Sequence, residues 1–170
     1  MGKRRKGREI VLQAYYASLI SGADLQATLE DQILRRESAP ETVEFSRRLM
    51  TIISTNRRDL EGKVKSLISR NWNPERLGVL EKVILTMGVA ELVHSRDVPV
   101  RVVINEALEL TRRYCDEDAV AFVNGVLDAA AAKVYPDGIP AVGPAPEDEE
   151  PDQDDGDDEL DDFGPDKELR

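Results

Sequence analysis

The sequence predicts an all-α domain of about six or seven helices, and two observations carry this prediction. Apolar residues recur every three or four positions in one segment after another, which is the spacing of helices with one buried face. Glycine and proline residues separate these segments. The Val-rich run VPVRVVI at residues 98–104 could be a strand by propensity alone, but no neighbouring segment offers it a partner strand.

The first two helices lie on either side of a glycine turn. Apolar residues from Ile10 to Leu19 recur at helical spacing, and SGAD around Gly22 breaks the pattern. A second helix is expected between Leu25 and Leu34, and its apolar positions are Leu25, Leu29, Ile33 and Leu34.

A long helical segment follows and begins at Pro40. Proline fits the first turn of a helix, because the N–H that it lacks would have no partner there. The apolar positions of this segment continue to Leu67, and we expect a bend or break near Asn56.

The second half of the domain is expected to hold the central helix. Asn73 can cap it and Pro74 can lie in its first turn, and the residues from 77 to 93 are mostly apolar. RDVP ends this helix, and Pro99 can begin the next one, VRVVINEALELTRRYC. Asp116 is then a suitable N-cap for the final helix, EDAVAFVNGVLDAAAAKV.

The final helix contains two conflicting signals. Asn124-Gly125 is a common signal for a two-residue hairpin turn, but helical periodicity continues on both sides of it, from Ala119 to Val134. We therefore predict an unbroken helix. A glycine on its polar face suggests that a ligand approaches the backbone closely there.

Charge and composition divide the chain into a basic segment (residues 1–8), a helical domain (9–137) and an acidic tail (138–170). The net charge is −11, but residues 143–170 hold fourteen acidic and two basic side chains, which leaves +1 on the rest. The tail lacks the apolar content that would offset the entropy of ordering, so we expect it to be disordered. The folded part is near neutral, with five basic residues in GKRRKGR at 2–8.

An enzymatic or metal-dependent function has little support in the sequence. One cysteine and one histidine leave few ways to build a metal site, and no glycine-rich phosphate loop or paired nucleophile and base is present. We therefore expect no catalytic residue, no metal and no cofactor. The lack of a signal peptide and of a long apolar run favours the cytoplasm and argues against a membrane partner.

Several segments, in order, resemble the NusB family of bacterial transcription antitermination factors. They are RRKGREIVLQAYYAS near the start, LEKVILTMGVAELVHSRDVPVRVVINEALELTRRY in the middle and AFVNGVLD near the end. The resemblance covers roughly residues 3–135, and the run from Glu81 to Asp128 is its specific part. It implies a NusB-like fold of two small helical bundles packed roughly perpendicular to each other.

The resemblance also implies an adaptor function without catalytic activity. Members of the family bind the boxA element of ribosomal RNA leaders together with NusE, a small-subunit ribosomal protein. The complex acts on elongating RNA polymerase and opposes termination. Family members differ in whether the free protein is a monomer or a homodimer, so both states stay open for this chain.

The basic start supplies the first candidate RNA contacts, which are Lys3, Arg4, Arg5, Lys6 and Arg8. Their charges suit phosphate groups, and in the family an arginine-rich start binds RNA. Because Gly7 lowers helix propensity, we expect the first residues to order only on binding. The alternative is a frayed N-terminus that only aids solubility.

The second group of candidate RNA contacts lies at the final helix and comprises Tyr114, Asp118, Phe122, Asn124 and Gly125. Single-stranded RNA is recognised by stacking bases on aromatic rings and by hydrogen bonds to base edges, which Phe122 and Asn124 could supply side by side. Tyr114 is a further stacking candidate. The resemblance places Asp118 at the RNA face, where it tempers affinity. The alternatives are a core phenylalanine, a solvated asparagine and an acid that favours the helix start.

The resemblance matches Tyr16 and Glu81 to the surface that faces NusE. Tyr16 falls outside the main apolar sector of its helix, and an exposed tyrosine is a suitable interface anchor. The alternatives are a half-buried tyrosine and a surface glutamate in ordinary ion pairing.

A second class of function stays open at this point: a NusB-like protein-binding scaffold that uses its acidic tail and has no RNA function of its own. The tail departs from the typical family pattern. Its fourteen carboxylates could occupy the basic segment of the same molecule and compete with non-specific RNA, or they could serve solubility alone.

Deletion of the residues after Val142 tests this competition. If the tail carboxylates occupy the basic segment, the shortened protein will bind a non-specific RNA more tightly than the full chain at low salt. The difference will shrink as salt rises, because charges are screened over about 10 Å at 0.1 M ionic strength. Fluorescence anisotropy across a salt series measures both affinities. Equal affinities at every salt concentration would leave only the solubility role.

Overall fold

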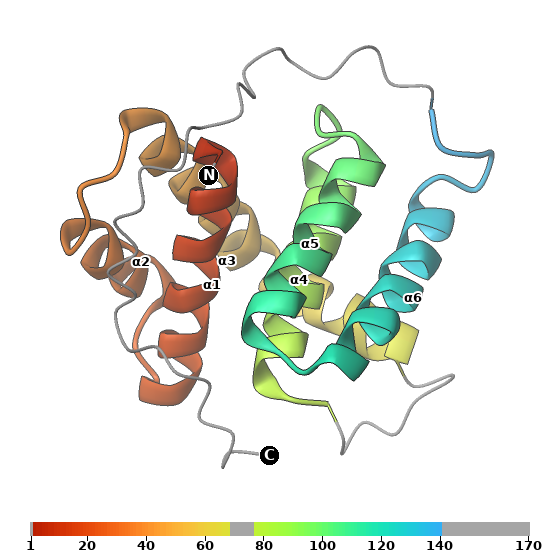
Figure 1. Ribbon diagram of the computed structural model, residues 1–170, viewed down its shortest axis with the longest axis horizontal. Helices are drawn as coiled ribbons and strands as arrows, with labels where there is room; N and C mark the ends of the chain where they lie inside the picture. The colour runs from red at the N-terminus through yellow and green to blue at the C-terminus, as the bar shows by residue number, and fades with distance from the viewer. Residues whose placement is uncertain (1, 69–76, 141–170) are drawn as a thin grey trace.

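Six α-helices make up most of the residues that the computed structural model describes, 2–68 and 77–140. They are α1 (Lys3–Ser21), α2 (Leu25–Leu34), α3 (Pro40–Ile68), α4 (Val79–His94), α5 (Val100–Tyr114) and α6 (Glu117–Val134) (Figure 1). These two ranges contain no strand, so the predicted all-α class is confirmed. The Val-rich run forms the start of α5.

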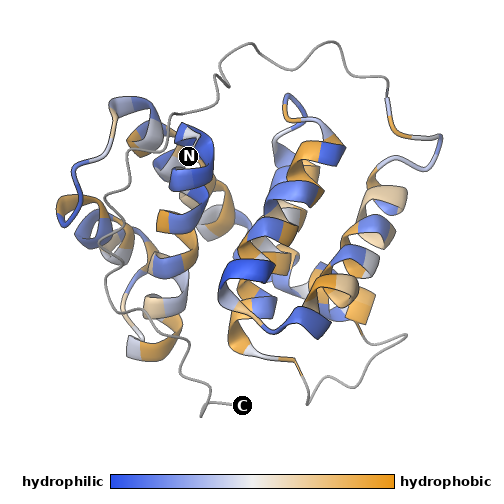
Figure 2. Ribbon diagram, viewed as in Figure 1, coloured by the Kyte–Doolittle hydropathy of each residue, from blue (hydrophilic) through white to orange (hydrophobic). Residues whose placement is uncertain are grey.

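The helices form two groups around one core. Figure 1 shows α1, α2 and α3 on one side and α4, α5 and α6 on the other, and both α1 and α3 pack against α4. One hydrophobic cluster contains buried side chains from all six helices. Figure 2 shows apolar and polar residues alternating around the helices, as expected where each helix buries one face.

The central position predicted for α4 is confirmed. Ten consecutive residues, from Val83 to Leu92, are buried, because neighbouring helices cover α4 on all sides. At Gly88 the helix α6 comes so close that an added Cβ would lie 2.8 Å from Cδ2 of Leu127. α4 therefore determines where both groups of helices sit.

Local signals place most helix ends where the sequence predicts them. Gly22 ends α1 in the left-handed conformation, with φ of 74°. Asp24 caps α2, and its carboxylate accepts a hydrogen bond from the Ala27 N–H at 3.0 Å. Pro99 and Asp116 are the N-cap residues of α5 and α6, although the Asp116 side chain makes no capping hydrogen bond.

Two expectations about the first half are corrected. α3 does not break at Asn56, whose side-chain amide donates to the Ile52 carbonyl at 2.8 Å within the same helix. Leu34, assigned to the apolar side of the second helix, is 84% exposed. The predicted cap Asn73 with Pro74 lies outside the described residues, as do residues 141–170 of the acidic tail.

The basic start is helical from Lys3 onward, which corrects the expectation that it orders only on binding. Contacts with α3 explain this: Thr42 Oγ1 donates to the Lys3 carbonyl at 3.1 Å. The Ser46 hydroxyl donates to the Thr42 carbonyl at 2.8 Å and lies 3.3 Å from the Gly7 carbonyl. A Cβ at residue 7 would lie 2.7 Å from Cδ1 of Phe45. Glycine therefore allows the close approach of the two helices, and their packing offsets a propensity cost of about 1 kcal/mol.

A buried ion pair joins α1 to α4. Arg8 donates two hydrogen bonds to the Glu91 carboxylate, at 3.0 and 2.8 Å, and the two side chains are 3% and 4% exposed. About one turn earlier, Arg5 donates two hydrogen bonds to Glu106 on α5, also at 3.0 and 2.8 Å. Charges removed from water need such pairing. These four side chains attach α1 to the second group of helices.

A second polar contact links α1 to α3. The Tyr15 hydroxyl donates to Glu61 at 2.9 Å, and the Arg57 guanidinium lies 5.6 Å from the centre of the Tyr15 ring. Burial, and after it the negative charge of Glu61, raises the pKa of Tyr15 to about 12. The phenol therefore stays protonated and remains a hydrogen-bond donor at neutral pH.

Loss of one member of the Arg8–Glu91 pair should destabilise the fold more than loss of both. Arg8→Met leaves the Glu91 carboxylate buried and unpaired, so it should lower the free energy of unfolding by about 3–5 kcal/mol. Glu91→Leu should cost less, because Glu106 lies 3.9 Å from Arg8 and still faces the cation. The double variant should recover much of the loss. Urea denaturation of the four proteins gives the coupling energy, and additive losses would contradict this prediction.

Candidate nucleic-acid interface

The cations at the start of α1 face different surroundings, so they do not form one uniform patch. Arg8 is 2% exposed and belongs to the buried pair, which corrects its predicted role as a phosphate contact. The Arg5 side chain is 42% exposed and shares its charge with Glu106. Lys3 forms an exposed pair with Glu41 at 2.9 Å.

Arg4 and Lys6 are the cations of this segment that are most open to an anionic ligand. Among the described residues, neither has a carboxylate within 4.0 Å. Arg4 lies over the Phe45 ring, 5.9 Å from its centre, and Lys6 is exposed. An exposed ion pair such as that of Lys3 contributes little stability, so a phosphate can replace its carboxylate. Lys3, Arg4 and Lys6 are therefore the cations at the start of α1 that a phosphate reaches most easily, and Arg5 is partly exposed beside them.

The Asn124-Gly125 pair lies inside α6, which is one helix as predicted. Gly125 is exposed, and no atom outside its own helix lies within 4 Å of the position that an added Cβ would take. No packing contact in the described part of the chain therefore requires glycine at this position. The backbone is open here to a ligand.

The regular geometry of α6 separates Phe122 from Asn124, which were expected to act side by side. Their side chains leave the helix about 200° apart, because each residue turns it by about 100°. Asp118, Phe122 and Gly125 share one flank; Asp118 is exposed and Phe122 is half-buried against the core. Asn124 is half-buried on the other flank. A base stacked on Phe122 would thus not be the one that Asn124 contacts.

Tyr114 is buried, and its predicted role as a stacking platform is corrected. The residue is 9% exposed, and its hydroxyl accepts a hydrogen bond from the Gln13 side chain at 3.1 Å. Burial is the main reason why the pKa of Tyr114 is raised. The ring belongs to the contact between α1 and α5.

The two residues matched to a partner surface occupy different kinds of position. Tyr16 is half-buried on α1, and Ile20, one turn further along, is 56% exposed, so this side of α1 offers apolar area. Glu81 lies in the first turn of α4, and its carboxylate folds over the N-cap residue Gly78, where a larger residue would collide with it. A negative charge at this position also favours the helix start.

Sequence reasoning missed the acids that neutralise the basic start. Glu91 is the one charged residue in the apolar run VILTMGVAELV, and a charge in such a run signals a buried partner.

Within residues 2–68 and 77–140, no three His, Cys, Asp or Glu side chains are placed to hold a metal ion. No helix in these ranges is long and apolar enough to cross a membrane.

The family model described as "NusB family" matches residues 5–132 of the chain. A protein named transcription antitermination protein NusB, from Enterobacter sp. (strain 638), is 40% identical over 134 residues, which cover 78% of this chain and 94% of that protein. The protein of the same name from Dehalococcoides mccartyi (strain CBDB1) is 34% identical over 128 residues, which cover 75% and 89%.

Solved structures have the same fold. NusB from T. maritima superposes with a TM-score of 0.69 at 28% identity, and the match covers 76% of this chain and 91% of that one. A complex of the antitermination factors NusB and NusE with double-stranded RNA contains a chain that matches with a TM-score of 0.70 at 23% identity, over 77% and 97%. From the family model and the curated relatives together, this chain belongs to the NusB family.

Proposed function

We propose that this protein is a transcription antitermination factor that binds boxA-type RNA of ribosomal RNA leaders together with NusE and acts on elongating RNA polymerase. The observation that carries the proposal is the family match over residues 5–132, which includes all of α1 except Lys3 and Arg4 and all of α6 except its last two residues. The candidate RNA contacts on α6 and the cations from Arg5 onward lie within this match. Relatives at 34–40% identity are named transcription antitermination proteins, which supports it.

In this proposal α1 supplies contacts to the RNA backbone. Arg4 and Lys6 bind phosphates directly, and Lys3 does so after it exchanges its Glu41 partner for a phosphate. Arg5 adds the exposed part of its guanidinium. Such contacts carry no sequence information and make the affinity fall as salt rises.

The exposed flank of α6 supplies the contacts to bases, which require a single strand whose bases are unstacked. The half-exposed ring of Phe122 stacks a base, and the bare backbone at Gly125 lets the RNA come close. Asp118 on the same flank repels phosphate but accepts hydrogen bonds from base amino groups, so it limits affinity for strands that present only their backbone. Asn124, on the opposite flank, contacts a different nucleotide.

The protein works as an adaptor and has no reaction to catalyse. NusE binds the side of α1 that carries Tyr16, with Glu81 at the start of α4 as a second contact. RNA and protein are then held on one small helical scaffold. Binding alone is sufficient for this function, so it needs no cofactor, and its compartment is the cytoplasm, where transcription takes place.

RNA binding in the presence and absence of NusE tests the proposal. The chain with NusE should bind a boxA RNA more tightly than a scrambled RNA of equal length, and the preference should persist as salt rises while non-specific binding weakens. Fluorescence anisotropy with both RNAs at several salt concentrations measures this. Equal and weak binding of both RNAs in the presence of NusE would refute the proposal.

Gly125→Ala should stabilise the fold and weaken RNA binding. The new methyl group has open space in the free protein, and alanine raises helix propensity by about 1 kcal/mol, but the methyl group would keep RNA away from the backbone. Gly62→Ala is the matched control, because Gly62 is also exposed within a helix and also has open space around it.

Thermal unfolding and RNA titration of both variants separate the two effects. Both should gain stability, and only Gly125→Ala should lose RNA affinity. If Gly125→Ala binds boxA RNA as well as the unchanged protein does, RNA does not approach the backbone at this site.

A further inference from the structure

Three arginine side chains gather around one phenylalanine ring where α1 meets α3. The guanidinium carbons of Arg8, Arg48 and Arg4 lie 5.0, 5.8 and 5.9 Å from the centre of the Phe45 ring. Phe45 itself is 7% exposed, so the ring is part of the core, and the three guanidinium groups lie over it. The sequence does not reveal this cluster, because its members come from two helices about 40 residues apart.

The charges of this cluster are balanced unequally. Arg8 is neutralised by Glu91 inside the protein. Arg4, half-buried on α1, and Arg48, exposed on α3, have no carboxylate within 4.0 Å among residues 2–68 and 77–140. Two surface cations that no acid of these residues neutralises therefore lie at the same ring, one from each helix. A bound polyanion would supply the missing negative charge.

The aromatic ring leaves both surface cations able to bind such an anion. A guanidinium held over a ring interacts through its charge, so its N–H groups, which lie in the guanidinium plane, are not used by that contact. A phosphate can accept two of these hydrogen bonds from one arginine. Phe45 thus orients Arg4 and Arg48 without occupying their donors.

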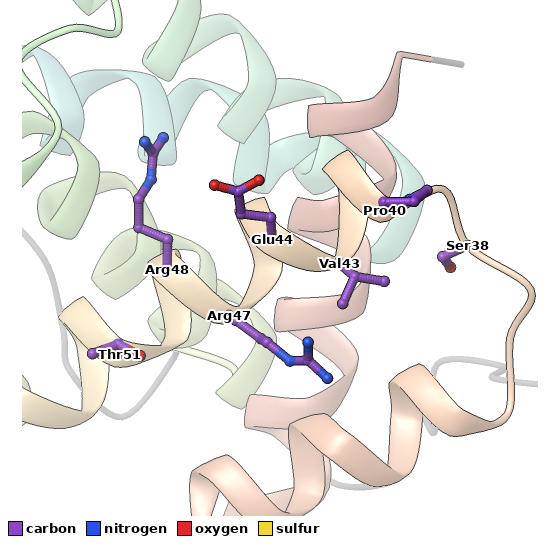
Figure 3. A pocket seen from close by; sticks show the side chains of 7 residues that line it. All are labelled: Ser38, Pro40, Val43, Glu44, Arg47, Arg48 and Thr51. Atoms are coloured by element: carbon purple, nitrogen blue, oxygen red, sulfur yellow. The ribbon is translucent and has the colours of Figure 1, made fainter.

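The surroundings of Arg48 favour an extended ligand over an isolated ion. Arg48 lines an open groove of about 700 Å³ along the first half of α3, together with Val43, Glu44 and Thr51. In Figure 3, Arg48 and Glu44 project from the same side of α3, whereas Arg47, which also lines the groove, points the other way and pairs with Glu30 at 2.8 Å. Glu44 is exposed and would repel a phosphate held by Arg48.

We propose that Arg48 on α3, together with Arg4 on α1, binds the phosphate backbone of RNA and extends the interface from the start of α1 onto α3. This inference rests on the proposed function and adds a surface that the sequence did not indicate. The contact is to the backbone, so it should act equally on boxA and scrambled RNA.

The test compares three variants of the full chain with the unchanged protein, all with NusE present. Arg48→Gln should weaken binding of both RNAs roughly fivefold at low salt and reduce the slope of log affinity against log salt by about 0.7, the value for one phosphate contact on a single strand. Arg48→Lys should keep the slope. Glu44→Gln should tighten binding of both RNAs, since it removes a repelling charge.

Arg58→Gln on the same helix is the matched control. Arg58 is exposed and lies more than two turns further along α3, so its replacement should leave affinity and slope unchanged. Circular dichroism and thermal unfolding check that each variant is folded.

An Arg48→Gln variant that binds both RNAs with unchanged affinity and slope would overturn the inference, as would a variant that loses only its association with NusE. Failure of the proposed function has a different signature, because the unchanged protein would then not prefer boxA RNA over the scrambled RNA. The salt slope of Arg48→Gln can be read on either RNA, so the two results are independent.

Discussion

The arrangement of α1 depends on the buried pair between Arg8 and Glu91. Because both charged groups are almost fully enclosed, any sliding or turning of the helix would leave a charge in apolar surroundings. The pair therefore fixes the rotation of α1 about its axis. That rotation directs Arg4 toward α3, Arg5 toward α5 and Lys6 toward solvent. The orientation of the candidate interface is therefore set by a contact inside the protein.

The helical fold could be predicted because its main determinants are local. Periodicity, Gly22 and Pro99 place the helices and their ends within a residue or two. Two errors arose at Asn56 and Gly7, where a residue with low helix propensity was taken to interrupt a helix. The Asn56 side chain bonds to its own helix backbone instead of ending it, and the propensity cost of Gly7 is offset by α3, which packs closely only because residue 7 is glycine.

The candidate site could be predicted only in outline, since burial depends on partners far away in the sequence. Composition indicates a basic start, but it does not show that Arg8 is buried in a pair with Glu91, which lies 83 positions later. Tyr114 is hidden in the same way by its contact with Gln13 on the first helix. The separation of Phe122 from Asn124, by contrast, follows from helix geometry alone.

The carboxylates that already neutralise part of the basic start determine which anions the protein can distinguish. A lone phosphate that displaces Glu41 from Lys3 or Glu106 from Arg5 exchanges one anion for another and gains almost nothing. An RNA strand that contacts several cations at once adds a small gain in binding free energy from each contact. It loses its translational and rotational entropy only once. At Lys3 and Arg5 the intramolecular pairs thereby favour a polymer over a single phosphate, whereas a small anion reaches Arg4 and Lys6 without displacing an acid.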